Sequence, residues 1–483
     1  MSILLDIEKS RLQASREVEI FKQKLNEQYF TPVDVAKYMV SLLSPSLEVN
    51  ILDAGAGVGN LGCIAALKYL ESSAENVTLC SVERDPNLYE YLRENILAIQ
   101  KRFSCCKCSI NNIDFYSFAK KAIADNIRFN RVIINPPYSK ISSRDENYSL
   151  LQELNVITPN AYTSFIKMCL RLMDEDGELV AIVPRSFCNG TLFTHFRVDL
   201  LKQASIHFIH LFNSRKKVFQ EYGINQEVVI IKIVKNKAPK PISICISDKL
   251  DQKNCTEFEA GKVIFRHDPY QFIHIPNKET DDRILGKIAQ LPSSLEQLGL
   301  TISTGKIVDF RETENLSFKK NLLSGFLIYK DHIVNGELQL DKKINKPIYL
   351  DINDQTIKKT IPIGNYVIMK RMSFKEDKGR IQSLILTKDM FGSNVMAIEN
   401  HLNYIHKDGK SLDLAIATGL NAFLTSQTVD EYIRRFSGHT QINASDIRSL
   451  PMPSYDTLAH VGKLIIRNRN IPMAEIETLI FGG

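Results

Sequence analysis

Near its amino-terminal end the chain carries the sequence Val49-Asn50-Ile51-Leu52-Asp53-Ala54-Gly55-Ala56-Gly57-Val58-Gly59-Asn60-Leu61-Gly62. The apolar run, the glycine-rich turn and the apolar segment from about Leu61 to Tyr69 predict a strand, a tight loop and a helix. Glycines at alternate positions permit positive φ and let a ligand approach the backbone closely. Such a turn also begins ordinary nucleotide-binding units, so it does not identify the ligand by itself.

The acidic residues around this turn narrow the choice of ligand. The next predicted strand, 78–82, ends at Glu83, where a carboxylate would hold a ribose diol. Asp53 stands before the glycines, and the spacing Asp-x-Gly-x-Gly-x-Gly differs from the dinucleotide pattern Gly-x-Gly-x-x-Gly. No pyrophosphate signature accompanies it, so the sequence favours an adenosyl ligand without phosphates over NAD.

A second motif, Asn135-Pro136-Pro137-Tyr138, directly follows the apolar run Val132-Ile133-Ile134. Because prolines fix φ and lack an N–H, they end the strand abruptly and make the turn rigid. The turn then presents the Asn135 amide oxygen, the Pro136 carbonyl and an aromatic face, which together suit a planar ring bearing an amino group. The alternative is a strand-ending turn with Tyr138 packed on it.

Strands and helices continue to alternate after this motif. Apolar runs at 178–184, 206–212 and 226–234 predict three further strands. A helix is predicted at 161–173, and another between the strands 178–184 and 206–212. This alternation predicts an α/β fold with a doubly wound sheet. The stretch 235–241, rich in Lys and Pro, has the composition of a domain boundary.

Taken together, these motifs resemble the class I S-adenosylmethionine-dependent methyltransferases that act on amino groups. The order of the motifs is similar to the gamma arrangement of the N6-adenine DNA methyltransferases, in which the target-recognition region is C-terminal. The resemblance implies a seven-stranded catalytic sheet, S-adenosyl-L-methionine as cofactor, and catalysis by Asn135, Pro136 and Tyr138. It implies cofactor contacts from Thr31, Asp53, Gly55, Gly57, Glu83, Asp114 and Phe115. One departure is that many gamma enzymes carry Pro-Ala near the first glycine, where this chain has Ala54-Gly55-Ala56.

Several of these residues also have structural explanations. Thr31 precedes Pro32 and the amphipathic segment 33–43, so we expect it to cap that helix, with cofactor contact as an added role. Asp114 could cap the helix 116–124 in the same way. In the resembled family an aromatic residue faces Tyr138 across the flipped base. We assign that role to Phe219, with Phe212 as the alternative; a core Phe beside a basic turn is the other explanation for Phe219.

The C-terminal half has a different character. Lys and Arg pairs are interleaved with aromatic residues, which suits a surface that binds phosphates and bases, although such charges are usually only solvated. Lys370 and Arg371 leave an apolar strand amid these basic loops, so we predict that they bind DNA. Three segments, 303–306, 308–311 and 436–453, resemble the methyltransferases of PstI- and BsuBI-type restriction-modification systems.

Length and composition set further limits. The 483 residues suffice for two or three domains, and we predict an N-terminal helix (1–28), a catalytic domain (29–240), a connecting segment (241–300) and an α+β target-recognition domain (301–483). We expect no membrane span, no signal peptide and a cytoplasmic location. The odd count of nine cysteines does not suggest a disulfide framework, and we predict reduced thiols and no metal at the cluster around Cys106. The net charge of +6 permits a polyanionic partner.

The sequence therefore predicts a site-specific adenine-N6 DNA methyltransferase that acts on double-stranded DNA, with a cognate restriction endonuclease as a separate protein. Two other functions stay open. A protein glutamine methyltransferase would share the Asn-Pro-Pro-Tyr motif but would not need the basic C-terminal half. A non-catalytic DNA-specificity subunit would not need an intact Asn135 and glycine loop.

Overall fold

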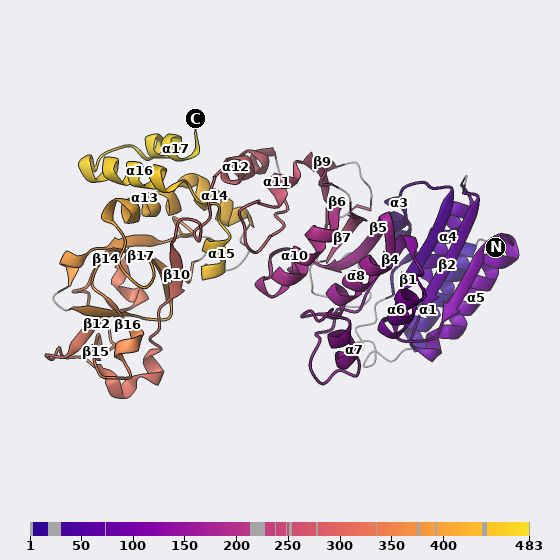
Figure 1. The fold of residues 1–483 in the computed structure, drawn as a ribbon, viewed down its shortest axis with the longest axis horizontal. Coiled ribbons are helices and arrows are strands. Elements are labelled where there is room, and N and C mark those ends of the chain that lie inside the picture. Colours follow the sequence, from indigo (N-terminus) through magenta and orange to yellow (C-terminus); the bar gives the residue numbers. More distant parts are fainter. Residues whose placement is uncertain are drawn as a thin grey trace. The chain divides into compact units, whose positions relative to one another are not determined.

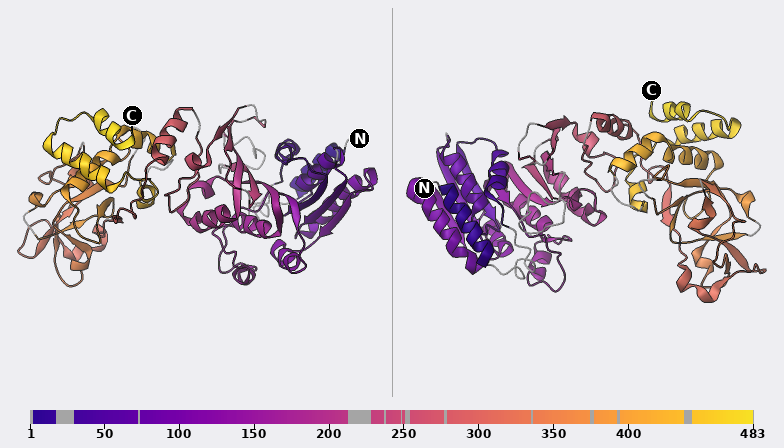
Figure 2. Two further views of the ribbon diagram at one scale, coloured as in Figure 1. Left: turned by 45° about the horizontal axis from the view of Figure 1, so that its top comes forward. Right: turned by 180° about the vertical axis from the view of Figure 1, so that it is seen from behind.

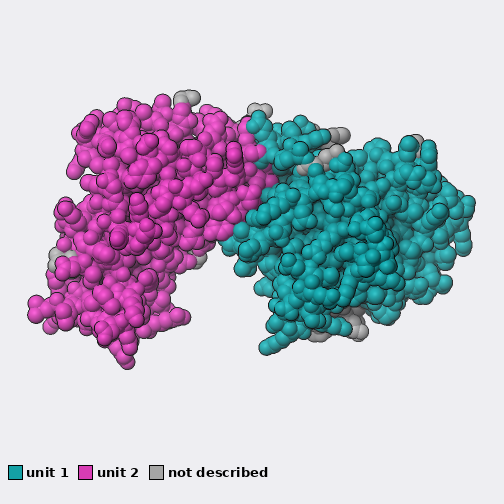
Figure 3. Space-filling model, in the orientation of Figure 1, with its two compact units in different colours: residues 1–260 teal, residues 261–483 magenta. Residues whose placement is uncertain are grey.

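The computed structural model describes residues 3–17, 30–72, 74–212, 228–236, 238–247, 249–250, 254–276, 279–334, 336–373, 377–391, 394–436 and 442–482. The chain divides into two compact units, Met1–Ala260 and Gly261–Gly483, which Figure 3 colours separately. Figure 1 labels their helices and strands. None of the described helices is long and apolar enough to cross a membrane.

The first unit is built on one sheet in the strand order β3-β2-β1-β4-β5-β7-β6-β8-β9. Strands β1 to β5 run parallel, and β7 is antiparallel to both β5 and β6. Its strands are β1 (Glu48–Ala54), β2 (Asn76–Val82), β3 (Lys107–Asn111), β4 (Phe129–Ile134), β5 (Met173–Pro184), β6 (Ala204–Leu211), β7 (Val228–Lys235), β8 (Ile242–Ile246) and β9 (Cys255–Phe258). The first seven confirm the predicted doubly wound sheet of a class I methyltransferase.

Helices cover both faces of this sheet. On one face α1 contacts α3, α4 and α5, and on the other α8 contacts α6 and α10 (Figures 1 and 2). The strand order reverses at β1, so right-handed crossovers on the two sides of β1 place their helices on opposite faces. These helices are α1 (Ile3–Glu17), α3 (Val33–Ser41), α4 (Asn60–Leu70), α5 (Pro86–Arg102), α6 (Phe115–Ala124), α8 (Ala161–Leu172) and α10 (Thr194–Gln203). The reversal at β1 also fixes the place for a ligand, at the carboxyl ends of β1 and β4.

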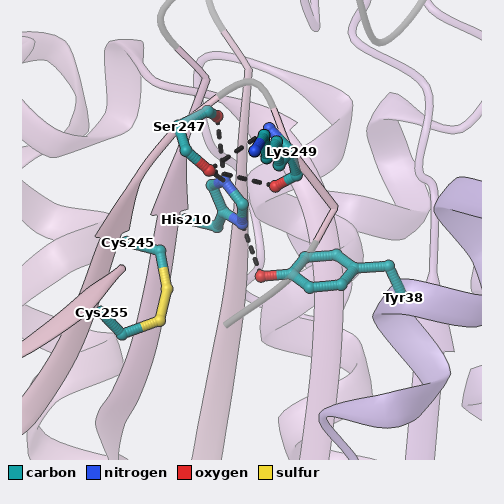
Figure 4. Close-up of a disulfide and its surroundings, with 6 residues drawn as sticks. All are labelled: Tyr38, His210, Cys245, Ser247, Lys249 and Cys255. Carbon is teal, nitrogen blue, oxygen red and sulfur yellow. Dashed lines mark hydrogen bonds between the residues drawn. A yellow bond between two sulfur atoms is a disulfide. The ribbon is translucent and has the colours of Figure 1, made fainter. Parts of the chain in front are cut away.

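The sheet extends beyond the seven predicted strands and beyond the predicted boundary at residue 240. Strand β8 pairs parallel with β6, and β9 pairs antiparallel with β8, so the first unit reaches Ala260. Cys245 and Cys255 lie opposite each other on these two strands and form a disulfide, shown in Figure 4, which the cysteine count did not suggest. Ile242 and Ile244 are buried, which explains why a segment after a Lys- and Pro-rich stretch joins the sheet.

The second unit is the predicted α+β region, and it begins at Gly261 instead of residue 301. Its larger sheets have the orders β10-β20-β17-β18 and β11-β15-β12-β19-β16. The strands are β10 (Thr301–Thr304), β11 (Leu316–Ser317), β12 (Ser324–Ile328), β15 (Tyr349–Asp351), β16 (Thr360–Pro362), β17 (Tyr366–Lys370), β18 (Ser383–Leu386), β19 (Val395–Ile398) and β20 (Leu402–His406). The segment that we predicted as a connection between domains contributes Phe265, Leu285 and Ile288 to the core of this unit.

A helical layer packs on the first of these sheets. Helices α13 (Leu414–Leu424) and α16 (Tyr455–Arg467) are in close contact. A Cβ atom at Gly419 would lie 2.0 Å from the carbonyl oxygen of Leu458, and one at Gly462 would lie 1.8 Å from that of Ala415. The two glycines therefore allow backbone-to-backbone packing that no side chain would permit.

Candidate active site

The glycine turn lies across the carboxyl end of β2. Gly55 and Gly57 have φ of 75° and 56°. The N–H groups of Gly55 and Ala56 donate to the Val82 carbonyl oxygen at 2.9 and 3.0 Å, which pins the turn to the sheet. Both glycines line a cavity, where their positive φ and missing side chains allow a ligand to approach the backbone.

Glu83 follows β2 and is held beside this turn. Its Oε2 accepts a hydrogen bond from the Gly57 N–H at 2.8 Å, and its Oε1 accepts one from the Asp85 N–H at 2.8 Å. Burial raises the pKa of Glu83, although these two bonds oppose the shift. Each oxygen keeps a second lone pair, so the carboxylate can accept two hydroxyl groups from a ligand in the cavity.

Asp53 occupies a different place from Glu83. It is buried, it is not among the residues lining the cavity, and its Oδ2 accepts from the Gly62 N–H at 2.8 Å. A Cβ atom at Gly62 would lie 2.7 Å from this oxygen, so glycine is required there. Burial raises the pKa of Asp53 to about 7. In this structure Asp53 joins the end of β1 to the first turn of α4.

The cavity has a volume of about 340 Å³ and lies at the carboxyl edge of the sheet, where the strand order reverses. Of the predicted site residues it brings together Gly55, Gly57, Glu83, Asp114, Phe115 and Asn135. Asp114 does cap α6, since its Oδ1 accepts from the Tyr116 and Ser117 N–H groups at 2.9 and 3.2 Å. Its Oδ2 also accepts from the Asn147 side chain at 2.9 Å. Capping and a position in the cavity wall are thus compatible.

Aromatic rings close the cavity around Phe115. The rings of Phe115 and Phe165 lie with centroids 4.7 Å apart, and a Cβ atom on Gly55 would sit 3.6 Å from Phe165. Phe30 lies over Gly57, 3.4 Å from the position of a Cβ there. Apolar walls of this kind suit a planar, apolar-faced group such as a purine.

Asn135 lies at the end of β4 between this cavity and a smaller one lined by Thr31, Gly55 and Gly57. Its side-chain nitrogen donates to Thr31 Oγ1 at 3.1 Å, and its Oδ1 accepts from the Tyr138 hydroxyl at 3.4 Å. The Tyr138 hydroxyl also lies 3.3 Å from the Ile182 carbonyl oxygen. These contacts fix the amide so that its carbonyl oxygen stands beside Tyr138.

The predicted capping role of Thr31 is wrong. Helix α3 has Pro32 at its N-cap position and no side-chain capping bond. The Pro32 carbonyl oxygen accepts the Ala36 N–H at 2.9 Å, which places the start of the helix one residue later than expected. The Thr31 hydroxyl is therefore available to Asn135, while the Thr31 carbonyl oxygen accepts from the Asn60 side chain at 2.8 Å.

The other residues predicted to catalyse the transfer or to stack on the base are Pro136, Tyr138, Phe219 and the alternative Phe212. Pro136 and Tyr138 are buried, and the Tyr138 ring meets Tyr162 edge-on with centroids 6.2 Å apart. Phe219 lies outside the described residues. Its alternative, Phe212, is buried and stacked on His210, with centroids 4.4 Å apart, so it is part of the core.

Sequence reasoning missed several residues that shape the site. Phe165 comes from α8 and Asn147 immediately precedes a short helix at 148–153. Neither belongs to a local motif, so only the fold brings them to the cavity. Phe30 and Asn60 each stand next to a motif residue in the sequence, which could have drawn attention to them. The sequence does not show that Phe30 lies over Gly57 or that Asn60 binds the Thr31 carbonyl oxygen.

In the second unit the two predicted DNA-binding cations differ in their surroundings. Lys370 is half-buried at the end of β17, and burial lowers the pKa of its ammonium group. The Arg371 guanidinium donates to the Asn400 carbonyl oxygen at 2.8 Å and lies 3.5 Å from Asn443 Oδ1. Arg371 therefore ties neighbouring segments together within this unit.

The sheet order, the glycine turn and the acid after β2 define the first unit as a class I methyltransferase. Residues 33–219 match the family described as Eco57I restriction-modification methylase. The chain is 36% identical to the type II methyltransferase M.BsuBI of Bacillus subtilis, over 99% of this chain and 97% of that protein. It is 33% identical to the type II methyltransferase M.PstI of Providencia stuartii, over 92% and 90% of the two chains. A third relative, M.HincII of Haemophilus influenzae, is 26% identical over 48% and 42%.

The chain therefore belongs to the type II DNA methyltransferases of restriction-modification systems, in the group of M.BsuBI and M.PstI, and S-adenosylmethionine is its methyl donor. The match to these two relatives spans both compact units. The match to M.HincII covers about half of this chain.

Proposed function

We propose that this enzyme transfers a methyl group to N6 of an adenine flipped out of duplex DNA. The observation that carries the proposal is the fixed amide of Asn135 at the carboxyl end of β4. Its nitrogen donates to Thr31 Oγ1 at 3.1 Å and its oxygen accepts from the Tyr138 hydroxyl at 3.4 Å, so the amide is oriented with its oxygen as the acceptor in a residue that lines the cavity. An acceptor in this position recognises an exocyclic amino group.

The residues around the large cavity fit S-adenosylmethionine, whose bound sulfonium supplies an electrophilic methyl group. Glu83 would accept the two ribose hydroxyls through the lone pairs that Gly57 and Asp85 leave open. Asp114 would accept the adenine amino group, and Phe115 and Phe165 would cover the ring faces. Asp53 would act from behind the cavity wall, by fixing the turn and the start of α4.

Adenine N6 is a weak nucleophile because its lone pair is delocalised into the ring. Acceptance of its two N–H bonds by Asn135 Oδ1 and the Pro136 carbonyl would localise that lone pair and favour a tetrahedral nitrogen. Groups that are already oriented stabilise the developing charge without reorganisation. The enzyme then needs positioning of the two reactants more than a strong base.

Tyr138 would stack on the flipped base. Its ring is held in place, because its hydroxyl meets Ile182 and Asn135 and the ring packs nearly perpendicular to that of Tyr162. A fixed ring loses little conformational freedom when a base stacks on it. Phe219 stays our proposal for the opposite face of the base.

We further propose that the second unit recognises the DNA sequence and that Lys370 contacts a phosphate. Full-length similarity to M.BsuBI and M.PstI supports this division, since the shared sequence continues beyond the catalytic unit. A restriction endonuclease acting at the same site would be a separate protein. An enzyme that modifies cellular DNA would act in the cytoplasm of a bacterium.

The two rival functions receive less support. A protein glutamine methyltransferase would leave the second unit, with its own core, without a role. A non-catalytic specificity subunit would have no need for the Glu83 and Asn135 arrangements, both of which are complete in the structure.

The direct test is product analysis. The full-length protein is incubated with plasmid DNA and labelled S-adenosylmethionine. The DNA is then hydrolysed to nucleosides, which are identified by mass spectrometry. We expect N6-methyldeoxyadenosine; a methylated cytosine or an unmodified product would overturn the proposal. Sequencing of DNA from cells that express the protein then locates the site.

The matched variant is Asn135→Ala. It should lower the turnover by about 10²- to 10³-fold, the usual effect of losing one oriented transition-state contact. S-adenosylmethionine affinity should change little. Asn76→Ala is the control, because Asn76 is exposed at the amino-terminal end of β2, at the opposite edge of the sheet. Retention of more than about a tenth of the turnover would remove Asn135 from catalysis.

A further inference from the structure

The loop between β11 and β12, residues 318–323, places apolar side chains in solvent. The exposed fractions of Phe318, Leu322 and Leu323 are 66%, 103% and 73%, and all six residues of the loop are exposed. Two adjacent, largely exposed leucines are unusual on a soluble protein and suggest a site of interaction.

The loop is ordered by its own polar groups, although its apolar groups are unpacked. The Lys319 N–H donates to Ser317 Oγ at 3.1 Å, and the Leu323 N–H donates to Asn321 Oδ1 at 2.8 Å. The Leu323 carbonyl oxygen accepts from the Ile352 N–H at 2.8 Å, directly after β15. The backbone is therefore pinned to the sheet while the two leucine side chains project from it.

The charge of the loop is positive. Lys319 and Lys320 stand between the exposed aromatic ring and the exposed leucines. Within residues 318–323 there is no acidic residue to balance these two charges. The two cations suit the phosphates of a DNA duplex, and the apolar tip suits the stacked bases inside it.

We propose that residues 318–323 form a wedge that enters duplex DNA. Leu322 and Leu323 insert between neighbouring base pairs and unstack them, and Lys319 and Lys320 bind the adjacent phosphates. Apolar wedges of this kind kink DNA and let a protein cover more of it. The inference rests on duplex DNA being the substrate, and not on which base atom receives the methyl group.

A protein partner fits this loop less well. A stable protein interface buries about 800 Å² on each side, which a loop of this length does not provide alone. Lysine is also depleted in such interfaces, whereas this loop carries two. The DNA wedge is the occupant that both the shape and the charge of the loop favour.

The test uses the full-length double variant Leu322→Ala/Leu323→Ala and a duplex carrying the methylation site, with aminopurine placed at successive positions. Since both side chains are exposed, the variant should keep the thermal midpoint and the S-adenosylmethionine affinity of the wild type. DNA binding should weaken about tenfold or more, the order of magnitude expected when leucine side chains that become buried on binding are truncated. With the wild type, aminopurine fluorescence should rise at the flipped base and also at the step that the wedge unstacks. In the double variant the rise at this second position should disappear.

Leu47→Ala is the matched control, because Leu47 is 55% exposed and precedes β1, at the edge of the sheet opposite the cavity. Lys319→Ala should reduce the salt slope of DNA binding by about one unit and keep the fluorescence change. Unchanged DNA affinity and fluorescence in the double variant would overturn the wedge. Loss of self-association with intact DNA binding would also overturn it, and would assign the loop to a protein contact. Neither readout requires methyl transfer, so both stay informative if adenine proves not to be the target.

Discussion

The hydrogen bond from Asn135 to Thr31 can be removed without changing the shape of the site. Thr31→Val replaces the hydroxyl by a methyl group of similar size, and Thr31 is 4% exposed, so no water would readily replace the lost acceptor. The bond from the Asn60 side chain reaches the Thr31 carbonyl oxygen and survives the substitution. The variant thus removes the contact that orients the Asn135 amide.

The size of the effect follows from the burial of the acceptor Thr31 and the half-burial of the donor Asn135. A net hydrogen bond contributes about 1 kcal/mol, and leaving a buried donor unsatisfied costs up to about 3 kcal/mol. If this cost falls on the transition state, turnover should drop by about 5- to 150-fold. Thr31→Ser keeps the hydroxyl and should keep most of the rate.

The assay is single-turnover methyl transfer at saturating S-adenosylmethionine and DNA, with cofactor affinity measured separately by calorimetry. A loss confined to cofactor affinity would mean that Thr31 binds the cofactor and does not orient Asn135. Equal turnover in wild type, Thr31→Val and Thr31→Ser would refute the reasoning.

Three further predictions follow from the described contacts. Glu83→Ala should weaken S-adenosylmethionine binding about tenfold or more, because a charged acceptor is lost, while DNA affinity stays unchanged; calorimetry with each ligand decides this. Burial raises the pKa of Asp53 from 3.8 to about 7, so the folded state keeps a proton that the unfolded state releases, and wild-type stability falls as the pH rises through that range. Asp53→Asn should therefore gain stability relative to the wild type, by up to about 4 kcal/mol, between about pH 4 and about pH 8; a pH-independent difference in urea unfolding would contradict this. Lys370→Ala should lower the salt slope of DNA binding by about one unit at an unchanged thermal midpoint, whereas Arg371→Ala should lower the midpoint; identical slopes for Lys370→Ala and wild type would remove Lys370 from the DNA surface.

The catalytic sheet was predictable because its signals are local. Strand, glycine turn and helix occur consecutively around Gly55, and the acid at Glu83 ends the next strand. The right-handedness of the crossovers then determines on which face of the sheet each connecting helix lies. The position of Asn135 directly after β4 was predictable for the same reason, since the two prolines after it mark the end of the strand within the sequence itself.

What could not be predicted depends on contacts between distant segments. Phe165 reaches the cavity only because α8 packs beside α6, and no spacing in the sequence carries that information. Thr31 showed the pattern of a helix cap, but a bond to Asn135, 104 residues away, determines its place. Strands β8 and β9 follow a Lys- and Pro-rich stretch that has the composition of a linker, and pairing with β6 overrides this local preference.

The pairing of β8 with β6 also decides where enzymes of this group could exchange their halves. A chain cut at residue 240 would leave the backbone N–H and C=O groups along β6 open, from Phe208 to Leu211, and such an edge recruits strands from other molecules. A hybrid joined there would take its last two sheet strands from a foreign parent. A junction after Ala260 keeps the sheet whole, so a hybrid that exchanges the second unit is best joined at that point.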